Sequence, residues 1–194
     1  MLGLGAAFFV ATRTPKPPEP PSASLLGRHG CTLRSYPSVG RTHVSASRPP
    51  EAYTIRYAKP GSAGKSLDGT TVTYDSFPPT SGPHYPRWTT WGAYSRPILE
   101  IQAVHNLEHG GIVIQYGRAV PAATVARIRR FYDGSPNGLL LAPLPALGAR
   151  IALSAWTYLA SCSGFDAIAF TAFRDAFRFK GPERFPASAL APGR

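Results

Sequence analysis

The alternation of hydrophobic and polar positions predicts short strands in several parts of the chain. Residues 53–57 and 70–74 are rich in β-branched and aromatic residues. Residue types alternate along both segments, which is typical of strands. Apolar runs over 111–116, 139–142 and 151–159 predict three further strands.

Two segments instead carry apolar residues at helical spacing. The first spans 122–132 and is followed by Asp133 and Gly134, and the second spans 165–179 and is followed by Gly181 and Pro182. Strands and helices do not alternate regularly, so the pattern predicts an α+β fold. We expect a single domain with a mixed or antiparallel sheet, two main amphipathic helices and long loops rich in Pro and Gly.

The start of the chain differs from the rest. Residues 2–11 are apolar but too few to span a bilayer, and a proline-rich stretch follows. We interpret 1–12 as a partial signal or membrane-anchor segment, 13–30 as a linker, 31–186 as a globular His-rich domain and 187–194 as a flexible tail. The alternative for the apolar start is that it packs on the domain.

The two cysteines, Cys31 and Cys162, lie far apart in sequence and form no CxxC motif. A disulfide between them is the natural pairing, and such a bond persists only in an oxidising compartment. This predicts an extracytoplasmic protein, secreted or tethered to the membrane by its N-terminal segment. The alternative is two buried, reduced thiols.

A formal net charge of +11 would suit an anionic partner. The surplus is spread along the chain and forms no dedicated basic tract, so we expect no nucleic-acid partner. An anionic cell envelope or membrane surface stays open as a partner.

The strongest chemical signal is the segment from His105 to His109, which reads HNLEH. On a helical turn, its two imidazoles face the same way and can hold one cation at about 2.0 to 2.1 Å. The order H-x-x-E-H also occurs in zinc hydrolases in which the Glu activates a bound water, although there it lies within a long helix. Here Gly110 and Gly111 follow at once.

A stable site needs further ligands. His84 lies in a loop stiffened by prolines, residues 77–91, and His43 would complete the set, whereas His29 falls in the linker. We therefore predict a divalent metal ion, zinc or copper, bound by His43, His84, His105 and His109. The alternative for these histidines is hydrogen-bonded packing against Tyr and Trp neighbours.

Two other functions remain open. Glu108 could act as a general base at an open metal position, in a metal-dependent hydrolase or a copper oxidase. A domain that uses no metal and binds the cell envelope through its charge is the third interpretation. Nothing in the sequence specifies a substrate.

Several segments together resemble one bacterial family, the domain of unknown function 3105. They are PPTSGPH (78–84), WGAY (91–94), VHNLEHGGIVIQY (104–116), Ala155-Trp156, Cys162 and Gly181-Pro182-Glu183. The resemblance implies an N-terminal membrane segment or signal before a Cys and a His soon after it, which here are Cys31 and His43. It thus favours the disulfide and a cluster of the four histidines. This chain has Thr157 where the family usually has a Gly after the Trp.

Overall fold

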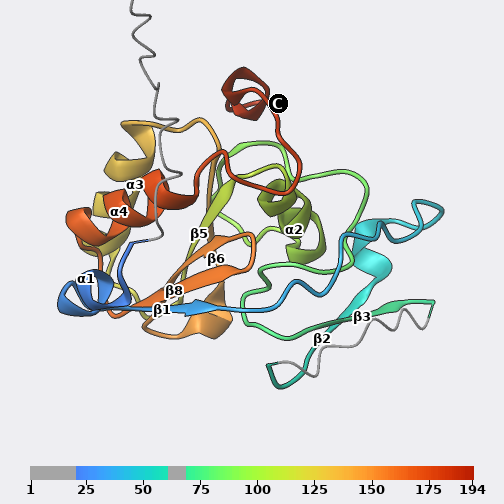
Figure 1. Cartoon of the computed structure of the whole chain (residues 1–194), viewed down its shortest axis with the longest axis horizontal. Coiled ribbons are helices and arrows are strands. Elements are labelled where there is room, and N and C mark those ends of the chain that lie inside the picture. The colour runs from blue at the N-terminus through green and yellow to red at the C-terminus, as the bar shows by residue number, and fades with distance from the viewer. Residues whose placement is uncertain (1–20, 61–68) are drawn as a thin grey trace, which may run out of the picture.

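The computed structural model describes residues 21–60 and 69–194, and their fold is α+β (Figure 1). The predicted fold class is confirmed. The elements, in chain order, are α1 Ala23–Arg28, β1 Cys31–Ser35, a 3₁₀ turn Pro50–Ala52, β2 Thr54–Tyr57, β3 Thr71–Tyr74, β4 Gly92–Ala93, α2 Glu100–Glu108, β5 Ile112–Tyr116, α3 Ala122–Asp133, β6 Leu139–Pro143, a 3₁₀ turn Pro145–Leu147, β7 Ile151–Ala155, β8 Tyr158–Cys162, α4 Ala167–Phe177 and a 3₁₀ turn Ala187–Leu190.

A mixed sheet of six strands organises the domain, in the order β1-β8-β7-β5-β6-β4. The pairs β1–β8, β8–β7 and β7–β5 are antiparallel, whereas β5–β6 and β6–β4 are parallel. The parallel pair β5–β6 is joined through α3, because a parallel connection needs a crossover. Strands β2 and β3 pair in parallel as a separate small sheet.

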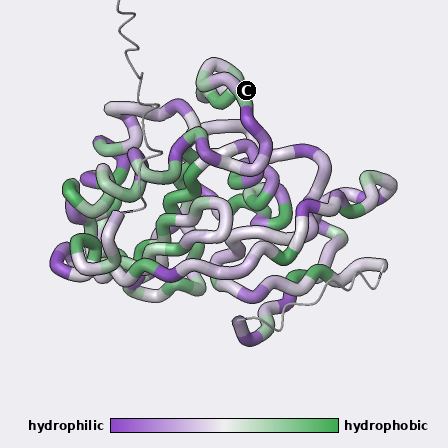
Figure 2. Tube along the Cα trace, in the orientation of Figure 1, coloured by the Kyte–Doolittle hydropathy of each residue, from purple (hydrophilic) through white to green (hydrophobic). Residues whose placement is uncertain are grey.

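Helices cover the two faces of the large sheet unequally. On one face α1, α3 and α4 pack on Ile112, Ile114 and their neighbours, whereas on the other face α2 packs on Val113 and Leu140. Successive residues of a strand point to opposite faces, so the apolar strand β5 supplies both layers of core. Figure 2 shows hydrophobic residues concentrated along the central strands and the helices on them.

The predicted strand over 151–159 is in fact two strands, β7 and β8, which form a hairpin with a turn at Trp156 and Thr157. Such tight turns favour residues with positive φ, and Thr157 has a φ of 63°. The family resemblance implied a Gly at this position. The apolar run predicted one strand because the turn carries none of the usual turn residues.

The ends of the domain extend beyond the predicted boundaries. The predicted linker ends earlier than residue 30, because Ala23–Arg28 forms α1 and its Leu26 is fully buried. The predicted flexible tail also packs on the domain: Leu190 is buried, and the backbone of Trp91 pairs with Gly193 and Arg194. The predicted signal or anchor segment, 1–12, and linker residues 13–20 lie outside the described residues.

A disulfide joins Cys31 to Cys162, as predicted. The two residues lie directly opposite each other on β1 and β8, and both side chains are buried in the main core. The disulfide fits an extracytoplasmic location. Within residues 21–60 and 69–194, no helix combines the length and the apolar character needed to cross a membrane.

Candidate metal centre

The imidazoles of His43, His84 and His105 meet in space although they come from three separate parts of the chain. Their ring centroids lie 4.9 Å apart for His43–His84 and for His43–His105, and 4.8 Å apart for His84–His105. With the carboxylate of Glu108 they offer four ligand atoms that all lie within 4.8 Å of one another. His43 is exposed and the other three side chains are buried, so the cluster is open to solvent on one side.

Helix α2 positions two members of this cluster. His105 and Glu108 are three residues apart, so they project from the same side of its last turn. Gly110 follows with a φ of +83°, a left-handed conformation common just beyond a helix end. The chain at Gly181 passes so close that a Cβ there would lie 2.1 Å from the carbonyl oxygen of Glu108. Glycine at this position therefore lets the C-terminal segment pack on the end of α2.

Backbone pairing holds the other two histidines side by side. His43 and His84 form an isolated parallel bridge, in which the His84 amide donates to the Thr42 carbonyl at 3.0 Å and the Val44 amide to the His84 carbonyl at 2.8 Å. The side chain of Asn106 fixes the same loop further along: it accepts from the amide of Thr89 and donates to its carbonyl. Asn106, the second residue of the HNLEH segment, thus anchors the loop that carries His84.

Backbone carbonyls fix the tautomers of the two buried histidines. The Nδ1 atoms of His84 and His105 lie 2.8 Å from the carbonyl oxygens of Gly82 and Tyr85. A carbonyl only accepts hydrogen bonds, so each Nδ1 carries the proton and each Nε2 of the neutral ring carries a lone pair. Burial lowers the pKa of both rings and favours that neutral form. Metal-binding histidines are oriented in this way.

The Nε2 atom of His84 has no hydrogen-bond partner among the described residues, although its side chain is completely buried. It lies 3.0 Å from Oε2 of Glu108, but the two atoms form no hydrogen bond. Two ligands of a tetrahedral zinc ion lie about 3.3 to 3.4 Å apart, with both lone pairs aimed at the ion rather than at each other. The buried pair fits two neighbouring ligands of one cation.

Arg41 and Glu183 belong to the same cluster, and sequence reasoning assigned neither of them a role. Arg41 donates from Nε to Oε1 of Glu108 at 2.7 Å and from a terminal nitrogen to Oε1 of Glu183 at 3.0 Å. The hydrogen bond to Glu108 raises the pKa of Arg41. The only sequence signal for Glu183 was its place in Gly181-Pro182-Glu183, one of the segments that carry the family resemblance. Nothing in the sequence pointed to Arg41.

His109 lies beside the four-atom group. Its Nε2 is 3.1 Å from Nε2 of His105 and 3.3 Å from Oε2 of Glu183, and with Glu108 and Glu183 it forms a second, smaller group of candidate ligands. Its ring stacks on Phe185 and contacts the edge of Trp88. Burial, and then the neighbouring His105, lower the pKa of His109 to about 4.

His29 lies elsewhere and pairs with Asp166 at 3.2 Å, in keeping with its exclusion from the predicted ligands. The structure therefore brings three of the four predicted histidine ligands together with Glu108, and places His109 next to them.

The model of one protein family, described as "Protein of unknown function (DUF3105)", matches residues 66–189 of this chain. The match covers more than half of the chain, which therefore belongs to this family, as the resemblance indicated. Cys31, Arg41 and His43 precede the matched region. The search of curated proteins found no match, and neither did the search of solved structures.

Proposed function

We propose that this protein is an extracytoplasmic metal-binding domain that holds zinc or copper through His43, His84, His105 and Glu108. The observation that carries the proposal is the buried Nε2 of His84, which has no hydrogen-bond partner among the described residues and lies 3.0 Å from a carboxylate oxygen. A neutral imidazole lone pair beside an ionised carboxylate is unfavourable in a buried site unless a cation lies between them.

The donor set supports a transition metal. Three imidazoles and one carboxylate match the ligands that zinc prefers, and imidazoles also suit copper. Arg41 neutralises Glu108 on Oε1, which leaves Oε2 facing His84. A divalent ion in this site would therefore meet two imidazoles and a carboxylate already held in one orientation by hydrogen bonds, together with the ring of His43, which lowers the ordering cost of binding.

The location outside the cytoplasm is supported by the disulfide, because cytosolic thiols are kept reduced. Attachment through residues 1–12 is part of the proposal and follows from their apolar sequence alone. An anionic envelope surface stays a proposed partner on the strength of the positive charge.

The geometry favours binding over hydrolysis by Glu108. A general base needs a free oxygen near an attacking water. Here Arg41 occupies Oε1, and Oε2 lies against His84. The exposed ring of His43 nevertheless leaves one side of the site open, so a metal-dependent reaction without Glu108 as base is the second candidate.

Metal content and affinity test this proposal. The protein is purified without a histidine tag, analysed for metals, and titrated with Zn²⁺ and Cu²⁺ after removal of any bound ion. We expect one equivalent per chain, a loss of at least a hundredfold in affinity in His84→Ala and His105→Ala, and about a 10- to 100-fold loss in His109→Ala, because that ring contacts a ligand.

The matched control is His29→Gln, which removes an imidazole outside the cluster and should bind metal as the wild type does. Equal metal binding in the wild type and in His105→Ala, with both proteins folded, would refute the proposal. A greater loss in His109→Ala than in His84→Ala would instead show that the ligand set is wrong.

A further inference from the structure

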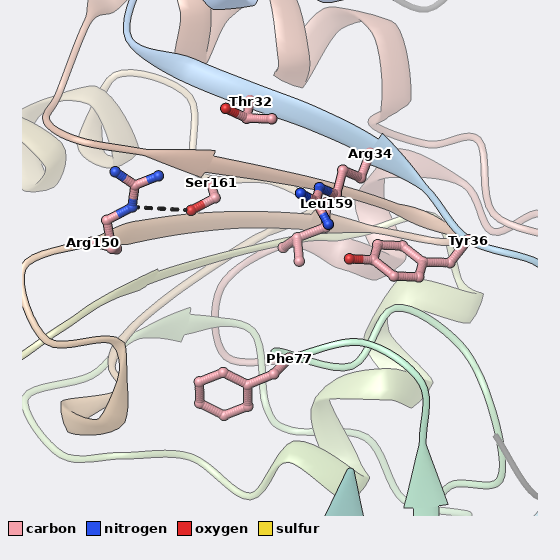
Figure 3. A pocket seen from close by; sticks show the side chains of 7 residues that line it. All are labelled: Thr32, Arg34, Tyr36, Phe77, Arg150, Leu159 and Ser161. Carbon is pink, nitrogen blue, oxygen red and sulfur yellow. Dashed lines mark hydrogen bonds between the residues drawn. The ribbon is translucent and has the colours of Figure 1, made fainter. Parts of the chain in front are cut away.

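Among the described residues, no helix covers the β1 edge of the large sheet on the face that carries α2, and Thr32 and Arg34 are exposed there. Helix α2 packs on β5 and β6, and the neighbouring strands β7, β8 and β1 continue the same face beyond it. A cavity of about 250 Å³ lies there, between the strands and the loop that carries Phe77 (Figure 3). None of the four residues that offer ligand atoms in the candidate metal centre lines this cavity.

Two arginines give this cavity a positive charge. Arg34, on β1, and Arg150, just before β7, both line it, and no Asp or Glu does. The guanidinium of Arg34 has no hydrogen-bond or ion-pair partner within residues 21–60 and 69–194. Arg150 donates from Nε to the hydroxyl of Ser161 at 3.3 Å, so its two terminal nitrogens keep their donors for a ligand. Guanidinium groups recognise anions best through two parallel hydrogen bonds.

The strand register adds hydroxyl groups on the same face. Thr32 and Ser161 lie directly opposite each other on β1 and β8, and Tyr36 follows Arg34 by two residues, so all three point to the side of the cavity. Each hydroxyl can donate a hydrogen bond to an anion. Figure 3 shows Ser161 beside Arg150, and the hydroxyl of Tyr36 turned toward the cavity rather than away from it.

The remaining wall is apolar. Phe77 lies across the cavity from the strands, with 37% of its surface exposed, and Leu159 forms part of the floor. An aromatic side chain with a free face can pack against a ring or a hydrocarbon group of a ligand. The cavity thus combines a cationic, hydroxyl-rich side with an apolar one, which is the pattern of a small-molecule site.

We propose that this cavity binds the phosphate monoester group of a small organic molecule. A monoester carries nearly two negative charges at neutral pH and three acceptor oxygens, which matches two guanidinium groups and the nearby hydroxyls. A carboxylate offers one charge and two oxygens and leaves one arginine without a partner. The organic part of the ligand packs against Phe77.

The test uses phenyl phosphate as probe, with benzoate as the carboxylate counterpart, in calorimetric titrations of the full chain at constant ionic strength. We expect saturable, one-to-one binding of phenyl phosphate and at least tenfold weaker binding of benzoate. The variant Arg34→Ala/Arg150→Ala should bind phenyl phosphate at least tenfold more weakly. The variant Arg34→Lys/Arg150→Lys should also bind less tightly, because lysine keeps the charge but not the planar pair of donors.

The matched control is Arg118→Ala/Arg130→Ala, which removes the same charge from two exposed positions outside the cavity and should bind as the wild type does. The proposal is overturned if this control loses as much affinity as the cavity variant, or if the lysine variant binds as tightly as the wild type, since summed charge would then explain the binding. Binding only to vesicles that contain phosphatidylglycerol, with none to phenyl phosphate, also overturns it. His105→Ala should leave phenyl phosphate binding unchanged, so this test is independent of the metal.

Discussion

Breaking the disulfide should cost the domain a large part of its stability. Cys31 and Cys162 are separated by 131 residues, so the bond closes most of the domain into one loop. In the chain-entropy model, closing a loop of this length stabilises the folded state by about 5 kcal/mol at room temperature. A domain of this size unfolds with a total free energy of about 5 to 15 kcal/mol, so the bond would supply a third or more of it.

The assay is thermal unfolding of the wild type and of Cys31→Ala/Cys162→Ala, each with and without a thiol reductant. A loss of about 5 kcal/mol lowers the Tm of a domain of 150 to 250 residues by about 10 to 20 °C. The wild type should fall by a similar amount when reduced, and the variant should not respond to reductant. Since both side chains lie in the core, part of the fall in the variant comes from lost packing, and the reduced wild type controls for this.

A Tm for the double variant within about 3 °C of the wild type would refute the reasoning, because the structural role of the bond would then be negligible.

Three further substitutions test local features of the fold by denaturant unfolding. Asn106→Ala should destabilise the domain by about 2 to 4 kcal/mol, because it leaves the buried amide and carbonyl of Thr89 unpaired, and an unchanged free energy of unfolding would contradict this. Asp166→Ala should cost about 1 kcal/mol, because this carboxylate caps α4 by accepting two backbone amides. Those hydrogen bonds lower the pKa of Asp166 in the folded protein. The stability that Asp166 contributes should therefore be complete above the pKa of the unfolded chain and be lost as the pH falls through the lower pKa of the folded protein. If Asp166→Ala still lowered the free energy of unfolding in strong acid, that loss would have another origin. Thr157→Gly should stabilise the domain by up to about 1 kcal/mol, because it relieves a β-branched residue at positive φ, and a loss of stability would show that the backbone is not strained there.

Periodicity predicted the elements with the clearest patterns. Helices α3 and α4 and strand β5 match their predicted ranges within a few residues, because each buries one stripe or one run of apolar side chains. The extent of α2 could not be predicted from the same signal. Its polar residues His105, Asn106 and Glu108 are buried as deeply as its apolar residues. Its sequence therefore lacks the regular alternation of apolar and polar faces that reveals an amphipathic helix.

The site was only partly predictable for a related reason. HNLEH and the proline-rich loop signalled His84, His105 and Glu108 locally, whereas Arg41 and Glu183 enter through contacts across 67 and 142 residues of chain. No spacing in the sequence encodes such contacts. The i, i+4 geometry correctly placed the rings of His105 and His109 side by side, with their Nε2 atoms 3.1 Å apart. It did not reveal that His109 also lies 3.3 Å from Glu183, which comes from a distant part of the chain.

In the proposed metal centre, three imidazoles and a carboxylate surround one cation. X-ray absorption at the zinc or copper edge of the metal-loaded, untagged protein reports these ligands. We expect a first shell of four nitrogen and oxygen atoms at about 2.0 to 2.1 Å, with imidazole scattering for three rings that falls to two in His84→Ala. A shell of oxygen atoms without imidazole scattering, or the same spectrum in His84→Ala, would contradict the account.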